Sequence, residues 1–182
     1  MSRQIKNIFA ITAFLICIGL INIAGQNIDI EIRGMNAFTF ILIVAVLLQI
    51  IFFIPSFLLK TEKYYDLVGS LTYVTTVSLA YFAVENKTMI DSIIYFYVMV
   101  WALRLGIYLF RRVRNDGKDV RFEKAKRHFF WFLQYWMGQA LWVSLTACAA
   151  IIAILSPEED TCLLYTSPSP RDMRRSRMPS SA

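Results

Sequence analysis

The chain has 182 residues, of which 57% are hydrophobic and only 18% are charged, with a formal net charge of +6. A soluble domain carries about 25% charged residues, so this composition excludes an ordinary soluble protein. The apolar residues come in blocks long enough to cross a bilayer, for which a helix needs roughly 20 of them. We therefore expect an all-α integral membrane protein, a bundle of about five transmembrane helices.

Five apolar blocks predict the spans in chain order: about 8–24, 37–59, 67–84, 90–110 and 129–155. The first block follows Arg3 and Lys6 as a secretory signal would, but no small-residue cleavage site follows it, so we expect a retained helix. The third block is less apolar than the others, with several Ser, Thr and Tyr. Residues 1–155 are expected to form one helical membrane domain.

The final segment, 156–182, abandons this apolar pattern for Pro, Ser and Arg, which predicts a disordered tail. From about Cys162 it resembles a tail that recurs on unrelated translated sequences. We interpret that part as a sequence artefact and exclude it from fold reasoning. The native protein is then expected to continue beyond this chain.

Basic residues predict the orientation, because short loops rich in Lys and Arg stay on the cytosolic side. With five spans, the amino terminus and the loops 60–66 and 111–128 share one side and hold most of the basic residues between spans, whereas the opposite loops offer only Arg33 and Lys87. The amino terminus is therefore expected in the cytosol. The membrane would be the endoplasmic reticulum in a eukaryote or the inner membrane in a bacterium.

Polar residues inside the spans are the first functional signal, since a charge in a bilayer is expensive and usually marks a functional interior. One face of the fourth span carries Tyr97, Trp101, Arg104 and Tyr108 at helical spacing. Arg104 lies about 10 Å along the helix from Arg111. It either snorkels to the headgroups or pairs inside the bundle, with Asp66 as the expected partner.

Two neighbouring spans carry polar stripes at the same depth. The stripes consist of Asp66, Gly69, Ser70 and Tyr73 in the third span and Gln134, Tyr135, Gly138, Gln139 and Trp142 in the fifth. We expect the third, fourth and fifth helices to enclose a polar cavity that opens toward the 111–128 loop. The rival interpretations are interhelical packing through Gly138 with glutamine hydrogen bonds, and a first-turn or capping role for Asp66.

The basic loop has two interpretations. Its arginines could bind phosphates bidentately, with Asp119 orienting them or accepting ribose hydroxyls. Alternatively, the loop is a polybasic stretch attracted to anionic lipid. No nucleic-acid reader motif and no metal-ligand spacing occurs, and the lone His128 is expected to face solvent or headgroups.

Three sequence runs resemble the uncharacterised membrane proteins related to steroid 5-alpha reductase. They are Tyr65-Asp66-Leu67-Val68-Gly69-Ser70, then Trp101-Ala102-Leu103-Arg104-Leu105-Gly106-Ile107-Tyr108-Leu109-Phe110-Arg111-Arg112, then Gly117-Lys118-Asp119-Val120-Arg121-Phe122, with Gln139 in the next span. The resemblance covers roughly 37–150. Its most specific element is Trp-x-Leu-Arg-Leu-x-x-Tyr-Leu followed by Asp-x-Arg.

The resemblance implies a membrane reductase that uses NADPH to saturate a carbon-carbon double bond in a steroid-like or other lipid enone, which would enter from the bilayer. The cofactor contacts implied are Asp66, Arg104, Arg112, Asp119 and Arg121, with Gln139 as a weaker candidate. The catalytic donor stays open, although Tyr73 and Tyr108 lie on suitable faces. Nothing indicates the oligomeric state.

One departure from the family pattern is large. Such proteins usually end in two further helices with an Arg-His-Pro-x-Tyr motif, which this chain lacks, so we expect a truncated and inactive fragment. Phospholipid and isoprenylcysteine methyltransferases share a similar architecture and bind S-adenosylmethionine. A non-enzymatic scaffold or transporter subunit is the third class, although the polar groups gather at one side rather than at the midplane.

Overall fold

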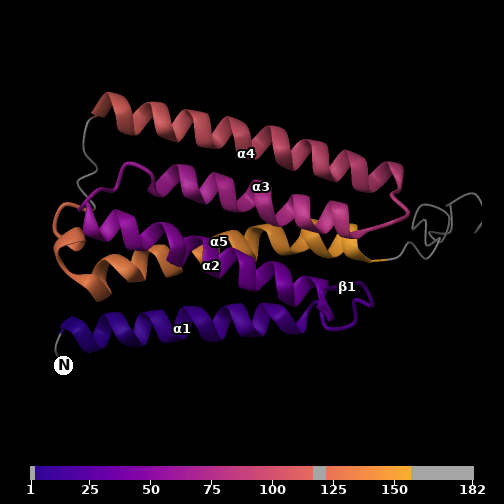
Figure 1. The fold of residues 1–182 in the computed structure, drawn as a ribbon, viewed down its shortest axis with the longest axis horizontal. Helices are drawn as coiled ribbons and strands as arrows, with labels where there is room; N and C mark the ends of the chain where they lie inside the picture. Colours follow the sequence, from indigo (N-terminus) through magenta and orange to yellow (C-terminus); the bar gives the residue numbers. More distant parts are fainter. Residues whose placement is uncertain (1–2, 117–121, 157–182) are drawn as a thin grey trace, which may run out of the picture.

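The computed structural model describes residues 3–116 and 122–156, with side chains up to Arg112 in the first range. Its long helices are α1 (Arg3–Ile23), α2 (Ala37–Leu58), α3 (Tyr65–Ala83), α4 (Met89–Asp116) and α5 (Phe129–Leu155) (Figure 1). A short 3-10 helix, η1 (Ala125–Arg127), precedes α5. The predicted all-α class is confirmed. The expected tail from residue 157 onward lies outside the described residues.

Three helices form the centre of the bundle. α2, α3 and α5 pack against one another, while α1 lies along α5 and α4 lies along α3 (Figure 1). Only 6% of the apolar stretch of α1 and 11% of that of α4 is buried inside the protein, against 39% in α2 and in α5. The two flanking helices therefore present most of their apolar surface to the bilayer.

α3 owes its polar composition to its central position. Four of the described helices are long and apolar enough to cross a membrane, and α3 is not among them. Its buried Thr72 and Thr76 donate to carbonyls four residues earlier, at 2.7 and 2.8 Å, and Gln49 of α2 donates to the Thr72 hydroxyl at 3.0 Å. With 19 residues, α3 is about 28 Å long, close to the roughly 30 Å of a hydrocarbon core. The neighbouring helices shield these hydroxyls from lipid.

A small hairpin joins α1 to α2 and was not anticipated from the sequence. Strands β1 (Glu31–Ile32) and β2 (Met35–Asn36) pair antiparallel around Arg33 and Gly34, whose φ angles are 54° and 75°. Positive φ at both central residues is the hairpin turn geometry that glycine favours. Asn36 then caps α2 by accepting from the Thr39 backbone N–H at 3.1 Å.

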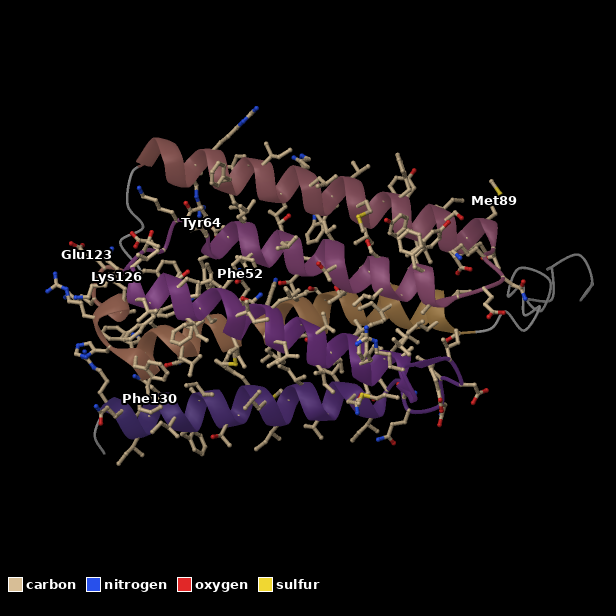
Figure 2. The ribbon with its side chains drawn as sticks, in the orientation of Figure 1. Phe52, Tyr64, Met89, Glu123, Lys126 and Phe130 are labelled. Atoms are coloured by element: carbon tan, nitrogen blue, oxygen red, sulfur yellow. The ribbon has the colours of Figure 1, made fainter. Side chains whose placement is uncertain are left out.

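The predicted basic segments gather at one end of the bundle. The amino terminus and the α2–α3 loop lie there together with η1, and the labelled Tyr64, Glu123 and Lys126 mark this end, opposite Met89 (Figures 1 and 2). The Arg3 guanidinium lies 4.8 Å from the centre of the Trp131 ring, which ties the start of α1 to α5. We call this the basic end. The side of the membrane that it faces stays a prediction.

Candidate functional site

A cavity of about 540 Å³ lies at the basic end, between the start of α3, the first half of α5 and one residue of α1. Its walls include Phe14, Tyr65, Asp66, Gln134, Tyr135, Gly138 and Gln139. Pockets for small molecules usually measure about 300–1,000 Å³, so its size suits an organic ligand. The whole stripe predicted on the fifth helix lines this cavity, whereas the stripe predicted on the third helix contributes only Asp66.

Asp66 carries the charge on the cavity wall. It lies in the first turn of α3, where a carboxylate is favourably placed at the positive end of the helix dipole. Arg112 of α4 reaches it, with 3.3 Å between Nη2 and Oδ2. The Asp66 side chain is 12% exposed and that of Arg112 is 41% exposed, so the guanidinium has surface left for a second, anionic contact.

Gln139 supplies an amide to the same cavity. Its tip lies against Gly69 of α3, where any Cβ would clash with the Gln139 side chain. Its Oε1 is buried and has no hydrogen-bond partner within the described part of the chain. A buried polar atom without a partner is costly, by about 1–3 kcal/mol, and such an atom beside a cavity is a natural ligand contact.

A second ion pair holds the far end of the basic loop. Lys126 of η1 donates to Glu62 of the α2–α3 loop at 2.8 Å, and the two side chains are only 20% and 5% exposed. Glu62 and Asp66 are four residues apart and bind residues on either side of 117–121. The end of the α2–α3 loop and the first turn of α3 thus bind residues on both sides of the central part of the loop predicted to hold phosphates.

A cluster of aromatic side chains packs beside the cavity and holds the start of α3 against α5. The Tyr65 ring packs at a tilt against Phe122 and edge-to-face against Trp136, with ring centres 4.8 and 5.3 Å apart, and its hydroxyl donates to the Tyr135 carbonyl at 3.0 Å. Phe132 and Trp136 are fully buried below it. These contacts fix the backbone of α5 at Tyr135, whose side chain lines the cavity.

The expected interior pairing of Arg104 is wrong. Arg104 is exposed, as are its stripe companions Tyr97 and Tyr108, at 69% and 65%. Of the described α4 side chains, Asp91 near the start is buried, as are Ala102 and Gly106, and the last two lie about 200° around the helix from Arg104. Ser70 of α3 donates to the Ala102 carbonyl at 2.6 Å. The closest approach of α4 to α3 is therefore made by small residues, for which the small-xxx-small spacing was the sequence signal, while Tyr95 and Trp101 pack their rings on Tyr81 and Tyr73 of α3.

The cavity walls also differ from those expected. α4 reaches the site through Arg112, but none of its side chains that the structure describes lines the cavity, because α3 stands between α4 and α5. α1 takes its place: Phe14 lies opposite Gly138, 3.4 Å from where a Cβ on that glycine would stand. Nothing in the apolar pattern of the first span distinguished Phe14 from its neighbours.

Two other predicted groups are placed away from the cavity. Tyr73 is buried and its hydroxyl bonds to Thr146 of α5, while Tyr108 faces outward. Asp119 and Arg121 lie outside the described residues, so their predicted contacts stay predictions. Within 3–116 and 122–156, no cluster of His, Cys, Asp or Glu has the arrangement of a metal site.

The comparisons with known proteins give one match. Residues 52–167 match the model of a family described as "Protein of unknown function (DUF1295)", which covers more than half of the chain. The matched region overlaps most of the 37–150 stretch that carried the sequence resemblance, and it ends within the segment set aside from Cys162. Neither a curated protein nor a solved structure matches the chain significantly.

Proposed function

The chain belongs to this family, which is steroid 5-alpha reductase-like, and we propose that it is a membrane-bound reductase that uses NADPH to saturate a carbon-carbon double bond conjugated to a carbonyl. The observation that carries the proposal is the cavity at the basic end, with Gln139 in its wall and the Asp66–Arg112 pair at its edge. These groups suit a ligand that carries anionic and hydrogen-bonding groups.

The residues present fit such a cofactor in charge and in hydrogen bonding. Arg112 would contact a phosphate with the exposed part of its guanidinium, while Asp66 holds it in place. Gln139 would accept a hydrogen bond from an amide or a hydroxyl. Asp119 and Arg121 of the basic loop lie outside the described residues and remain proposed contacts.

The reaction requires that the protein bind the hydride donor, stabilise the charge on the substrate's carbonyl oxygen and admit the substrate from the bilayer. When bound, NADPH would supply a hydride to the β carbon of the enone, and a proton from a protein group or water would complete the α carbon; the negative charge that develops on the carbonyl oxygen needs a placed donor, worth about 3–4 kcal/mol. Tyr135 is the phenol best placed for this role, because it lines the cavity and its hydroxyl has no hydrogen bond to any described residue. The apolar wall at Phe14 belongs to α1, a helix exposed to lipid, and suits a substrate that arrives from the bilayer.

Binding measurements separate this proposal from the methyltransferase alternative. The test uses the full-length protein, purified and titrated with NADPH and with S-adenosylmethionine. We expect NADPH to bind, and Gln139→Leu to weaken it about tenfold, the effect of losing one hydrogen bond of roughly 1.4 kcal/mol.

The matched control is Gln26→Leu, because Gln26 is an exposed glutamine at the opposite end of the bundle. It should leave the NADPH affinity unchanged. Binding of S-adenosylmethionine alone would favour the methyltransferase class, and binding of neither compound would favour a non-enzymatic role.

A further inference from the structure

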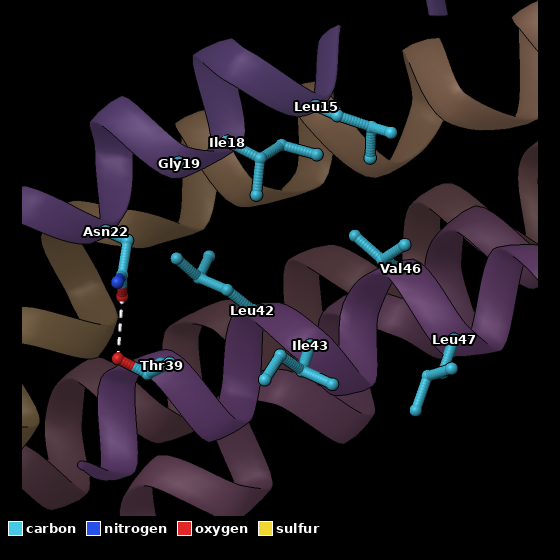
Figure 3. Close-up of a pocket in the computed structure, with 9 residues that line it drawn as sticks. All are labelled: Leu15, Ile18, Gly19, Asn22, Thr39, Leu42, Ile43, Val46 and Leu47. Carbon is cyan, nitrogen blue, oxygen red and sulfur yellow. Dashed lines mark hydrogen bonds between the residues drawn. The ribbon is translucent and has the colours of Figure 1, made fainter. Parts of the chain in front are cut away.

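A groove of about 300 Å³ runs between α1 and α2, in the half of these helices nearer the hairpin (Figure 3). Buried Ile18 and Leu42 form its floor, and Leu15, Ile43 and Leu47, each 42–48% exposed, form its rim. The groove opens sideways, on the surface that α1 and α2 present to the bilayer. It is separate from the cavity at the basic end, with which it shares no residue.

One end of the groove is polar. The Thr39 hydroxyl donates to Asn22 Oδ1 at 2.8 Å, the bond drawn in Figure 3. Among the described residues, none accepts a hydrogen bond from Asn22 Nδ2, which leaves that donor available. Asn22 is the last residue but one of α1, and Thr39 is the third of α2. The polar end therefore lies where these helices leave the hydrocarbon.

This order of polarity matches a phospholipid in a bilayer. From Leu15 to Asn22 the groove extends about 10 Å along α1, apolar for its length and capped by an amide donor. An acyl chain has the same order, with its ester carbonyl at the interface and its methylenes below. A helix of a second copy, about 10 Å wide, is too large for a 300 Å³ groove between adjacent helices.

We propose that the α1–α2 groove binds one acyl chain of a bilayer phospholipid, whose ester carbonyl accepts a hydrogen bond from Asn22 Nδ2. The lipid belongs to the leaflet opposite the basic end. It fills the space that α1 leaves against α2, since α1 packs mainly on α5. This inference does not depend on the proposed reductase activity.

Gly19 provides a variant that fills the groove without disturbing the fold. It lines the groove, and a Cβ placed on it would meet no atom within 4 Å. Gly19→Leu should therefore occupy the space of the acyl chain, and loss of the glycine favours the helix. The matched control is Cys17→Leu, which adds apolar bulk at an exposed position of α1 outside the groove.

Photolabelling from the acyl chain of a phospholipid measures which residues this chain contacts. The protein is reconstituted in phosphatidylcholine vesicles that contain a photoreactive phosphatidylcholine with a diazirine on its acyl chain, and labelled residues are mapped by mass spectrometry. We expect groove residues to be labelled several times more than Ile16 and Leu20, which are 59% and 61% exposed. Gly19→Leu should lower this labelling about tenfold, since losing the burial of about two methylenes has that effect, and Cys17→Leu should not.

A second comparison tests the carbonyl contact. A dialkyl ether analogue of the probe lacks the ester carbonyl and should label the groove less than the diacyl probe. Asn22→Leu should remove that difference, while Thr39 keeps its 3.4 Å contact with Asn36. Equal labelling of the groove and of Leu20, no effect of Gly19→Leu, or cross-links between two copies at the groove would each overturn the proposal.

Discussion

Two arginines of α4, Arg104 and Arg112, show how position on a helix decides what a charge does. Arg112 points toward α3 and pairs with Asp66 at 3.3 Å. Arg104 lies on the outward face, exposed between aromatic side chains that also face the bilayer. Its location agrees with the snorkelling interpretation, in which the long side chain carries its charge toward the headgroups.

We predict that Arg112→Ala destabilises the protein by about 1 kcal/mol, because the ion pair is only partly buried. It should also weaken NADPH binding about tenfold, through loss of a phosphate contact. Arg104→Ala should change stability by less than about 0.5 kcal/mol. Thermal unfolding in detergent and an NADPH titration measure both effects.

A double-mutant cycle with Asp66→Asn provides the control for this prediction. Coupling should appear between Asp66 and Arg112 and be absent between Asp66 and Arg104. Coupling to Arg104 instead would mean that the interior pairing forms after all.

The helix α3 packs closely against α4 at Gly106 and against α5 at Gly69. Gly106 of α4 brings the backbone against Ser70, so a Cβ there would stand 2.7 Å from the Ser70 Cβ. Gly69 of α3 admits only the tip of Gln139, a flexible side chain that borders the cavity. The first contact is rigid and the second can adjust.

Gly106→Ala should therefore destabilise the protein, by about 1–3 kcal/mol from overpacking less about 1 kcal/mol gained in helix propensity. Gly69→Ala should be nearly neutral in stability, because the Gln139 tip can swing into the cavity. Unfolding of both variants by denaturant in the same detergent compares them. Equal destabilisation by the two alanines would show that the Gln139 tip is fixed.

Sequence patterns predicted the helices better than they predicted their faces. The apolar blocks located all five helices, and α2 and α5 begin at the expected residues 37 and 129. The contact face of α4 differs from the predicted one because, in lipid, the closest contacts belong to small residues such as Ala102 and Gly106 rather than to charged residues such as Arg104. The part of α1 in the cavity had no sequence signal, since it depends on tertiary packing of Phe14 against Gly138.

Over the whole molecule, the two ends differ in charge and in structure. The basic end holds the cavity, both ion pairs and the aromatic cluster, whereas the opposite end holds the hairpin and a surface with Asp29, Glu31 and Glu85. A cofactor with several phosphates would be attracted to the first end and repelled from the second. The position of the basic end relative to the cytosol therefore matters to the proposed function.

We predict that the basic end faces the cytosol, because basic residues in short loops are retained there. Lys63→Cys and Asn86→Cys place single thiols at exposed positions on opposite ends of the bundle. In a background with the native cysteines changed to serine, a membrane-impermeant maleimide applied to sealed, cytosol-inside vesicles should label Asn86→Cys alone. Lys63→Cys should react only after permeabilisation. Labelling of Lys63→Cys in sealed vesicles would reverse the orientation and place the cavity on the side away from cytosolic NADPH.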